Sequence, residues 1–427
     1  MSDRHDLRLA VSGIVAATLV CVFLSRMPAV QPRAQPVDED PTATGHGPEI
    51  DVPARHALIH SLPPLVDDAQ AVSPNHTRIA VSTRDQGVWV IDIATKTVAL
   101  TIPASGSVVD YIAWSSDSTT LALLRQGGVI EVFDAEGGEM RASLCTTPGL
   151  PDEIRRREIH FAAGDAVLIA TLGGPPTDIF PAHGGKLIAQ IGTGASRLTT
   201  AMALSRDGKL IALGDDGGTV AVWNALDGAP LPDITSVPLG KTFHRIHSLD
   251  FSPTGAVIAI GGGDCKVRLW KRDSAGPKQE FTFCDEDLFD NQAIGSARFS
   301  PDGTRLVATT FKYWDIRVWD VSTNDVVQWV DFGGGQARGI GAWFTTDGRF
   351  IFTDLACRVA LSVGQDPTQR GGQFDPRRLI PGGWPSSSKF AFFQSIGDYA
   401  WAVVDHHLVV RKIPDEEAVL RIPVREK

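Results

Sequence analysis

The sequence is poor in the residues on which most metal-binding and redox proteins depend. Its five cysteines, Cys21, Cys145, Cys265, Cys284 and Cys357, form no CxxC pair and have no spacing that would enclose zinc together with histidine. We therefore expect no structural metal and no cofactor. Cys21 lies in an apolar stretch, and the other four fit either two disulfides or four buried thiols. We favour buried thiols, because a large core needs no cross-links.

Charged residues are also scarce. They make up 21% of the chain, and the formal net charge is −10. Nucleic-acid binding depends on clustered Lys and Arg, so we expect no nucleic-acid partner. The 43% of hydrophobic residues, together with 42 glycines and 27 prolines, are typical of a globular protein built from many short strands and turns.

The sequence lacks the common catalytic signatures. It contains no GxSxG elbow, no HExxH helix and no phosphate-binding P-loop. The glycine cluster Gly261-Gly262-Gly263 stands at the end of an expected strand, and we interpret it as a loop. The sequence therefore predicts a binding protein rather than an enzyme.

Long hydrophobic runs are absent except for one near the N-terminus. The uncharged run Leu9–Leu24 follows Arg4 and Arg8 and favours a single-pass membrane anchor within residues 1–30, although its length also fits a cleaved signal peptide. A proline-rich linker follows at 31–62, and the remaining domain spans 63–427. The acidic residues after the run favour an N-terminus inside the cell, which places this domain outside the cytoplasm.

An internal repeat dominates the rest of the chain. Each copy consists of an apolar strand, a turn rich in Ser, Pro, Asp and Gly, and a second apolar strand, which is the pattern of a β-hairpin. Eight copies are present, at 72–83, 114–124, 161–172, 204–214, 251–261, 299–310, 344–354 and 393–404. A third, alternating strand follows in several of them, as in KVRLWK at 266–271 and DIRVWD at 315–320.

The period of the repeat indicates four-stranded blades. One position in the second strand is occupied by Ala80, Ala122, Ala170, Ala212, Ala259, Ala308, Phe352 and Ala402. The spacings between them are 42, 48, 42, 47, 49, 44 and 50 residues, close to the period of about 40–45 that a propeller blade requires. The small alanine lets neighbouring sheets approach closely, and a ring of blades protects the strand edges.

The copies FSPTGAVIAIGGGDCKVRLWK and FSPDGTRLVATTFKYWDIRVWD resemble WD40 repeats. This resemblance extends in weaker form over residues 65–424, and it implies an all-β fold, a β-propeller of seven or eight four-stranded WD40-like blades, with eight favoured. At the end of the third strand, the Trp-Asp dipeptide occurs only at Trp319-Asp320. Few copies can therefore build the buried His-Asp-Ser/Thr-Trp network of the family, and the region 356–388 is irregular enough for the seventh copy to lack a strand.

The resemblance implies a scaffold that binds a protein or peptide partner through its loops, and we expect the propeller to be monomeric. The candidate contact residues lie in long loops on one face, because long loops on a rigid framework carry most binding functions. They are Lys312, Tyr313, Trp314, Arg155, Arg156, Lys241, Arg245, Arg377, Arg378 and Trp384. The alternative function is a propeller enzyme or ligand sensor with its site at the central channel.

Overall fold

A computed structural model gives the architecture of the repeat region. The chain divides into two units, Met1–Asp51 and Val52–Lys427. The structure describes residues of the second unit only, in the ranges 58–59, 65–84, 87–147, 157–172, 176–194, 198–231, 245–271, 277–283, 293–310, 315–331, 341–348, 350–353, 359–362, 391–396, 399–404, 407–412 and 418–424. Within these ranges no helix has the length and apolar character needed to cross a membrane. The expected N-terminal anchor lies outside them.

All elements of the described part are β-strands, which confirms the expected all-β class. The strands form antiparallel sheets in which each strand pairs with the next one along the chain. Sheet 1 consists of β1 (Leu65–Val72), β2 (Arg78–Thr83), β3 (Val88–Asp92) and β4 (Thr97–Ile102). Sheet 2 consists of β5 (Val109–Trp114), β6 (Thr120–Arg125), β7 (Val129–Asp134) and β8 (Met140–Cys145).

The next sheets continue the same order. Sheet 3 consists of β9 (Arg157–Ala162), β10 (Val167–Leu172), β11 (Thr177–Pro181) and β12 (Ala189–Ile191), and sheet 4 of β13 (Thr199–Leu204), β14 (Leu210–Asp215) and β15 (Val220–Asn224). Sheet 5 consists of β16 (Ile246–Phe251), β17 (Val257–Gly262), β18 (Lys266–Lys271) and β19 (Pro277–Thr282).

Three sheets complete the described chain. Sheet 6 consists of β20 (Ile294–Phe299), β21 (Arg305–Thr310), β22 (Asp315–Asp320) and β23 (Val326–Asp331), and sheet 7 of β24 (Ala342–Phe344), β25 (Phe350–Thr353) and β26 (Val359–Ser362). Sheet 8 consists of β27 (Ala391–Ile396), β28 (Tyr399–Val404), β29 (His407–Lys412) and β30 (Ala418–Pro423). Each of the eight sequence copies supplies the first two strands of one sheet.

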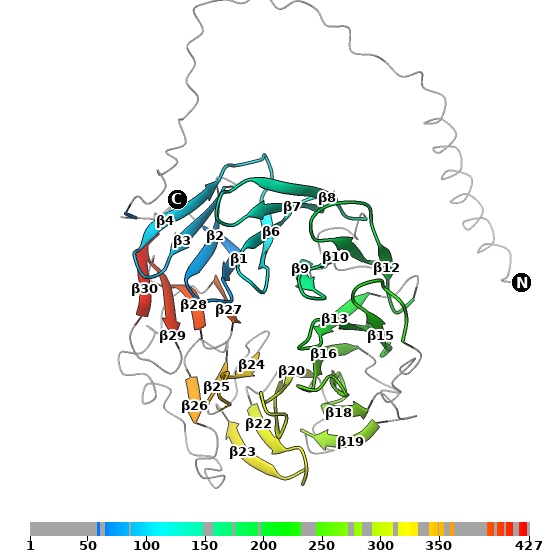
Figure 1. Cartoon of the computed structure of the whole chain (residues 1–427). Helices are drawn as coiled ribbons and strands as arrows, with labels where there is room; N and C mark the ends of the chain where they lie inside the picture. Colours follow the sequence, from blue (N-terminus) through cyan, green and yellow to red (C-terminus); the bar gives the residue numbers. More distant parts are fainter. Residues whose placement is uncertain are drawn as a thin grey trace, which may run out of the picture. The chain divides into compact units, whose positions relative to one another are not determined.

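Within this unit the sheets follow one another around a common centre, with their first strands on the inner side (Figure 1). First strands of neighbouring sheets are in contact, as β1 is with β5 and β16 is with β20. The last sheet also packs on the first, since Leu408 and Leu420 of sheet 8 share a buried cluster with Ile79 and Ile91 of sheet 1. Strand edges at the two ends of the repeat region are thereby brought together.

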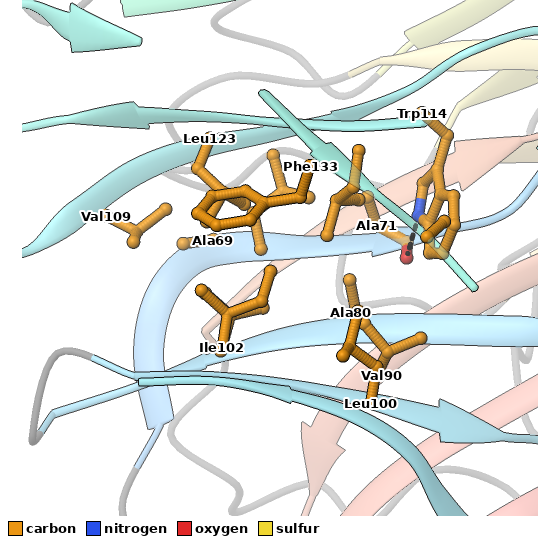
Figure 2. Packing of buried hydrophobic residues seen from close by; sticks show 14 of the residues in the cluster. Ala69, Ala71, Ala80, Val90, Leu100, Ile102, Val109, Trp114, Leu123 and Phe133 are labelled. Carbon is orange, nitrogen blue, oxygen red and sulfur yellow. Dashed lines mark hydrogen bonds between the residues drawn. The ribbon is translucent and has the colours of Figure 1, made fainter. Parts of the chain in front are cut away.

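The core lies between neighbouring sheets. Figure 2 shows one such interface, where Ala69, Ala71 and Ile102 of sheet 1 meet Trp114 and Phe133 of sheet 2. The Trp114 indole nitrogen donates a hydrogen bond to the Ala71 carbonyl oxygen at 3.0 Å, which ties the inner strands of the two sheets together. Sheets on both sides explain why consecutive strand residues are buried, rather than every second one.

The aligned alanines of the second strands serve this packing, but the expectation that they share one position is wrong for two of them. Ala80, Ala122, Ala212 and Ala259 each pair with the residue before the last of the first strand. Ala308 pairs instead with Ala297 and Ala170 with Ile159, so these two stand at other repeat positions. All six are at most 2% exposed and belong to inter-sheet clusters. A larger side chain there would force the sheets apart, at a cost of about 1–3 kcal/mol.

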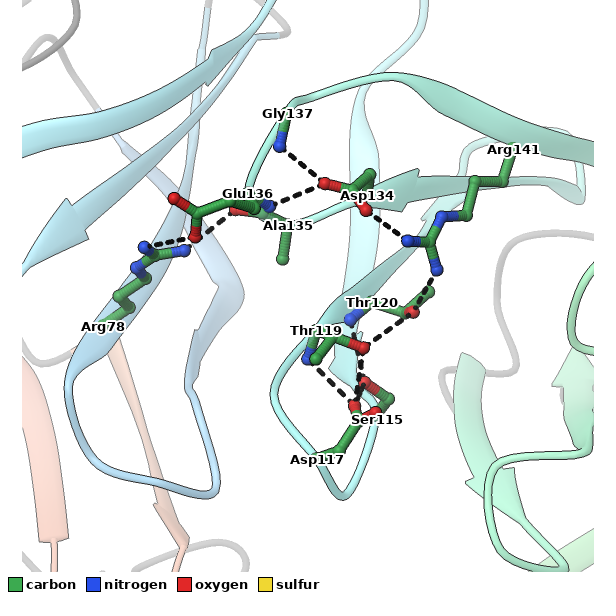
Figure 3. Close-up of polar contacts among 10 residues, drawn as sticks. All are labelled: Arg78, Ser115, Asp117, Thr119, Thr120, Asp134, Ala135, Glu136, Gly137 and Arg141. Carbon is green, nitrogen blue, oxygen red and sulfur yellow. Dashed lines mark hydrogen bonds and ion pairs between the residues drawn. The ribbon is translucent and has the colours of Figure 1, made fainter.

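Polar contacts hold the turns and also link sheets. Arg78 of sheet 1 donates to the Ala135 carbonyl oxygen at 2.9 Å and forms an ion pair with Glu136 at 2.9 Å, both in the last turn of sheet 2 (Figure 3). Asp134 closes that turn by accepting the Gly137 amide, and Arg141 binds its other oxygen. The Glu136 side chain is 74% exposed, so this ion pair adds at most about 1 kcal/mol to stability.

The expectation of four buried thiols is wrong for the two cysteines that the structure describes. Cys265 forms a disulfide, and its partner lies outside the described residues. Cys145, at the end of β8, is a free thiol but is exposed. Burial does hold for Cys265, which is 2% exposed within the cluster between sheets 5 and 6.

Candidate functional site

A similar turn follows several of the first strands, after Ser115, Ser205, Ser300 and Thr345. In sheet 6 the Ser300 hydroxyl donates to Asp302 Oδ1 at 2.6 Å and accepts the Arg305 amide at 2.9 Å. This hydroxyl, followed by the Thr304 amide, holds the pKa of the Asp302 carboxyl below its usual range. Gly303 adopts a φ of 75°, which favours glycine over any residue with a Cβ. The Ser-x-Asp-Gly pattern is therefore a rigid turn.

Four successive sheets bring these turns together around a pocket of about 460 Å³, which we call the strand-end pocket. It is formed by the C-terminal residues of β13, β16, β20 and β24 and by the first residues of the turns that follow. Its lining residues are Leu204, Arg206, Asp250, Phe251, Pro253, Arg298, Phe299, Pro301, Trp343, Phe344 and Thr346. These are the inner strands, so the pocket lies on the inner side of sheets 4 to 7, where their first strands end.

Asp250 connects two inner strands at this pocket. Its Oδ2 atom accepts the backbone amide of Phe299 at 2.7 Å, so β16 is tied to β20. Burial raises the pKa of the Asp250 carboxyl, and the positive charges of Arg298 and Arg206 oppose that rise. The carboxyl therefore binds a proton more readily than an ordinary aspartate does.

Both arginines are positioned by backbone oxygens. Arg298 Nη1 donates to the Leu249 carbonyl oxygen, and Arg206 Nη1 donates to the Pro301 carbonyl oxygen at 2.9 Å. Among the described residues these are the only hydrogen bonds that the two guanidinium groups make, and neither group forms an ion pair. The pocket therefore presents cationic N–H donors beside aromatic and proline walls.

Sequence reasoning missed this site, although a signal for it exists. The residue before the last position of the first strand is alanine in three copies, at Ala71, Ala113 and Ala203. The next three sheets place Asp250, Arg298 and Trp343 at the same position. Phe161 and Ser395 stand at this position in sheets 3 and 8, so the signal is the run of Asp, Arg and Trp in three consecutive sheets.

Of the contact residues predicted from the sequence, the structure describes only Arg245. It is exposed and directly precedes β16, at the opposite end of that strand from the pocket. A strand of six residues separates the two ends by roughly 17–20 Å. The other nine candidates lie outside the described residues: Arg155, Arg156, Lys241, Lys312, Tyr313, Trp314, Arg377, Arg378 and Trp384.

Two further expectations can be compared with the structure. Within the described ranges, no group of three or more His, Cys, Asp or Glu side chains could hold a metal ion. The expected scarcity of the family's buried network is visible at Trp270, which is 5% exposed and whose indole nitrogen has no hydrogen-bond partner. Near Arg245, burial lowers the pKa of His247 to about 4, with a smaller effect from the Arg245 charge.

Consecutive antiparallel sheets of this kind, each packed on the next, define the class of β-propeller repeat proteins. A model of the WD40 family, described as "WD domain, G-beta repeat", matches residues 237–271. The resemblance to WD40 repeats found in the sequence is thereby confirmed.

Known proteins similar to this chain are similar over limited lengths. Eukaryotic translation initiation factor 3 subunit I of Pyricularia oryzae is 29% identical over 124 residues, which are 28% of this chain and 32% of that protein. Telomerase protein component 1 of Rattus norvegicus is 25% identical over 209 residues, which are 49% of this chain and 7% of that protein. The chain thus spans about a third or less of the length of these relatives.

Among solved structures, the chain is similar to the β-propeller domain of Cps50 (Swd1) from Myceliophteria thermophila. The sequence identity is 13%, and the TM-score is 0.49. The similarity covers 67% of this chain and 93% of that domain.

Proposed function

We propose that the protein is a WD40-repeat scaffold that binds a protein or peptide partner through the loops at the Arg245 end of its inner strands. The observation that carries this proposal is the packing of each sheet on the next, with sheet 8 on sheet 1. Such a framework holds its loops in fixed positions, as a binding surface requires. By their name, the similar initiation-factor subunits belong to a multi-chain assembly, which supports a role in protein binding.

The test of this function compares two charge-removing variants of the full-length chain. Arg245→Ala removes a cation from the proposed face, and Lys186→Ala removes an exposed cation between β11 and β12. We expect the Arg245 variant to lose a partner that wild-type protein and the Lys186 variant retain, with all three melting at the same temperature. Equal retention by all three proteins would contradict a role for this face.

The same approach tests the expected anchor of that face, Trp314, with its neighbours Lys312 and Tyr313. An aromatic residue at the centre of an interface contributes about 2 kcal/mol or more to binding. Trp314→Ala should therefore weaken partner retention at least about tenfold without lowering the melting temperature. A lowered melting temperature with the partner retained would identify Trp314 as a packing residue.

We also propose that the propeller has eight blades, one for each sheet. The shared cluster of sheets 8 and 1 supports closure between the ends of the repeat region. Deleting residues 388–427 would expose Ile79, Val81 and Ile91, which are fully buried at that junction. We expect the truncated chain to aggregate or to unfold at lower temperature. A monomeric truncation that melts like wild type would reduce the blade count.

We further propose that Leu9–Leu24 anchors the protein in a membrane and that the propeller lies outside the cytoplasm. The disulfide at Cys265 supports an oxidising compartment, since disulfides persist mainly there. Deleting residues 1–34 should release the protein from the membrane fraction. In intact cells, external protease should digest the propeller of the full-length chain. Complete protection from protease would contradict the proposed orientation.

A second candidate function is a ligand sensor with its site at the central channel. The strand-end pocket favours it, because a volume of about 460 Å³ lies within the usual range of ligand sites, about 300–1,000 Å³. A small-molecule sensor would bind its ligand without a protein partner. Isothermal titration compares the affinity of wild type and of the Arg298→Gln variant for the same ligand. Because the proposed scaffold face lies at the other ends of the inner strands, a change in this affinity separates the sensor function from the scaffold function.

A further inference from the structure

The charges of the strand-end pocket point to an anionic ligand. Arg206 and Arg298 together carry two positive charges, and Asp250 is the one acidic side chain in the lining. The pocket is therefore cationic in a chain whose net charge is −10. Both guanidinium groups lie close enough to Asp250 to lower its pKa, but neither forms an ion pair among the described residues. A guanidinium group is suited to bidentate binding of a carboxylate or phosphate group.

The walls restrict what the anion is attached to. Phe251, Phe299 and Phe344 are 6%, 8% and 9% exposed and form a fixed floor. Trp343, Pro253 and Pro301 are half-buried around it. Such walls favour a ligand that places apolar groups beside its charge, because burial of apolar surface adds about 25 cal/mol per Å². A free inorganic ion would leave these walls uncovered.

The position of the pocket fits a peptide. Arg206 and Thr346 on its rim are exposed, so the pocket opens to solvent where the turns end. Its volume of about 460 Å³ accommodates a few amino-acid side chains rather than a folded domain. With Asp250 ionised, the two arginines leave the lining a charge of +1, which matches a ligand of one negative charge.

We propose that the strand-end pocket binds a peptide segment in which an acidic side chain stands between apolar residues, with Arg206 and Arg298 holding its carboxylate. The proposal rests on the protein-binding function proposed above and adds a second contact site, at the other end of the inner strands. A partner chain can thus contact both ends of the central channel.

The test uses three pools of acetylated and amidated pentapeptides that differ only in the central residue. The flanking residues are Leu, Val, Phe or Trp, and the central residue is glutamate, glutamine or phosphoserine. Binding to the full-length protein is measured by fluorescence polarisation. We expect the glutamate pool to bind at least about tenfold more tightly than the glutamine pool, since a charge-assisted pair adds roughly 1.5–3 kcal/mol.

Matched variants localise the binding. Arg206→Gln alters an exposed side chain and should weaken glutamate binding about tenfold, whereas Lys186→Gln removes the same charge elsewhere and should change nothing. Arg298→Gln should act like Arg206→Gln. Any of four results would overturn the proposal. These are equal binding of the glutamate and glutamine pools, tighter binding of the phosphoserine pool than of the glutamate pool, no binding of any pool, and undiminished glutamate binding by Arg206→Gln. A partner lost from Arg245→Ala would still support the proposed scaffold in any of these cases.

Discussion

The hydrogen bond between sheets 1 and 2 offers a direct test of how the sheets are held together. Trp114 is 7% exposed, and its indole nitrogen donates to the Ala71 carbonyl oxygen at 3.0 Å. Trp114→Phe removes that bond, at about 1 kcal/mol, and leaves a cavity that costs about 1–2 kcal/mol more. The expected loss is therefore about 2–3 kcal/mol of unfolding free energy.

The assay is thermal unfolding followed by circular dichroism, with Trp89→Phe as the control. Trp89 is half-buried at the edge of the cluster between sheets 1 and 8, and its indole makes no hydrogen bond among the described residues. For a domain of this size, the Trp114 variant should melt on the order of 4 °C lower. If both variants lose the same stability, the hydrogen bond to Ala71 does not join the sheets as described.

Three further changes test other parts of the structure. Burial lowers the pKa of His247 to about 4. As the pH falls below about 6.5, the unfolded chain therefore binds a proton at His247 that the folded chain does not. In urea titrations, the unfolding free energy of wild type should fall by about 1–2 kcal/mol between pH 7.5 and 5, and that of His247→Gln should show no such loss. Cys265→Ser should lower the unfolding free energy by about 2–4 kcal/mol. A reductant should lower the melting temperature of wild type but not of this variant. A wild type whose melting temperature does not respond to reductant would contradict the disulfide. Ser300→Ala removes the hydrogen bonds of its hydroxyl to Asp302 and Arg305 and should lower the unfolding free energy by about 1–2 kcal/mol. An unchanged melting temperature would show that Asp302 and Gly303 hold the turn without it.

The repeat made the strands predictable, because each copy carries its own turn chemistry. The positions of Ala80, Ala122 and Ala212 in buried second strands follow from period and residue size alone. Contacts between sheets were not predictable in this way. The bond from Trp114 to Ala71 joins residues 43 positions apart, and nothing local in either segment indicates it.

The strand-end pocket shows the same limit. Asp250, Arg298 and Trp343 each stand in an ordinary strand, and each is about one repeat from the next. Their proximity follows from the packing of successive inner strands, which places equivalent repeat positions side by side. Comparing one repeat position across all copies would have revealed them, whereas the search for long loops directed attention to the other face.

The proposal that this WD40-like protein is a binding scaffold is tested most directly by site-specific photo-crosslinking in its native host. A benzophenone amino acid replaces the exposed Asp216, in the turn between β14 and β15 at the proposed face, in one full-length protein and Lys186 at the other exposed turn in another, so that Arg245 stays intact in both. We predict a discrete cross-linked polypeptide from position 216, reproducible between preparations, and none from position 186. The absence of any product at 216, or the same products at both positions, would contradict the scaffold function.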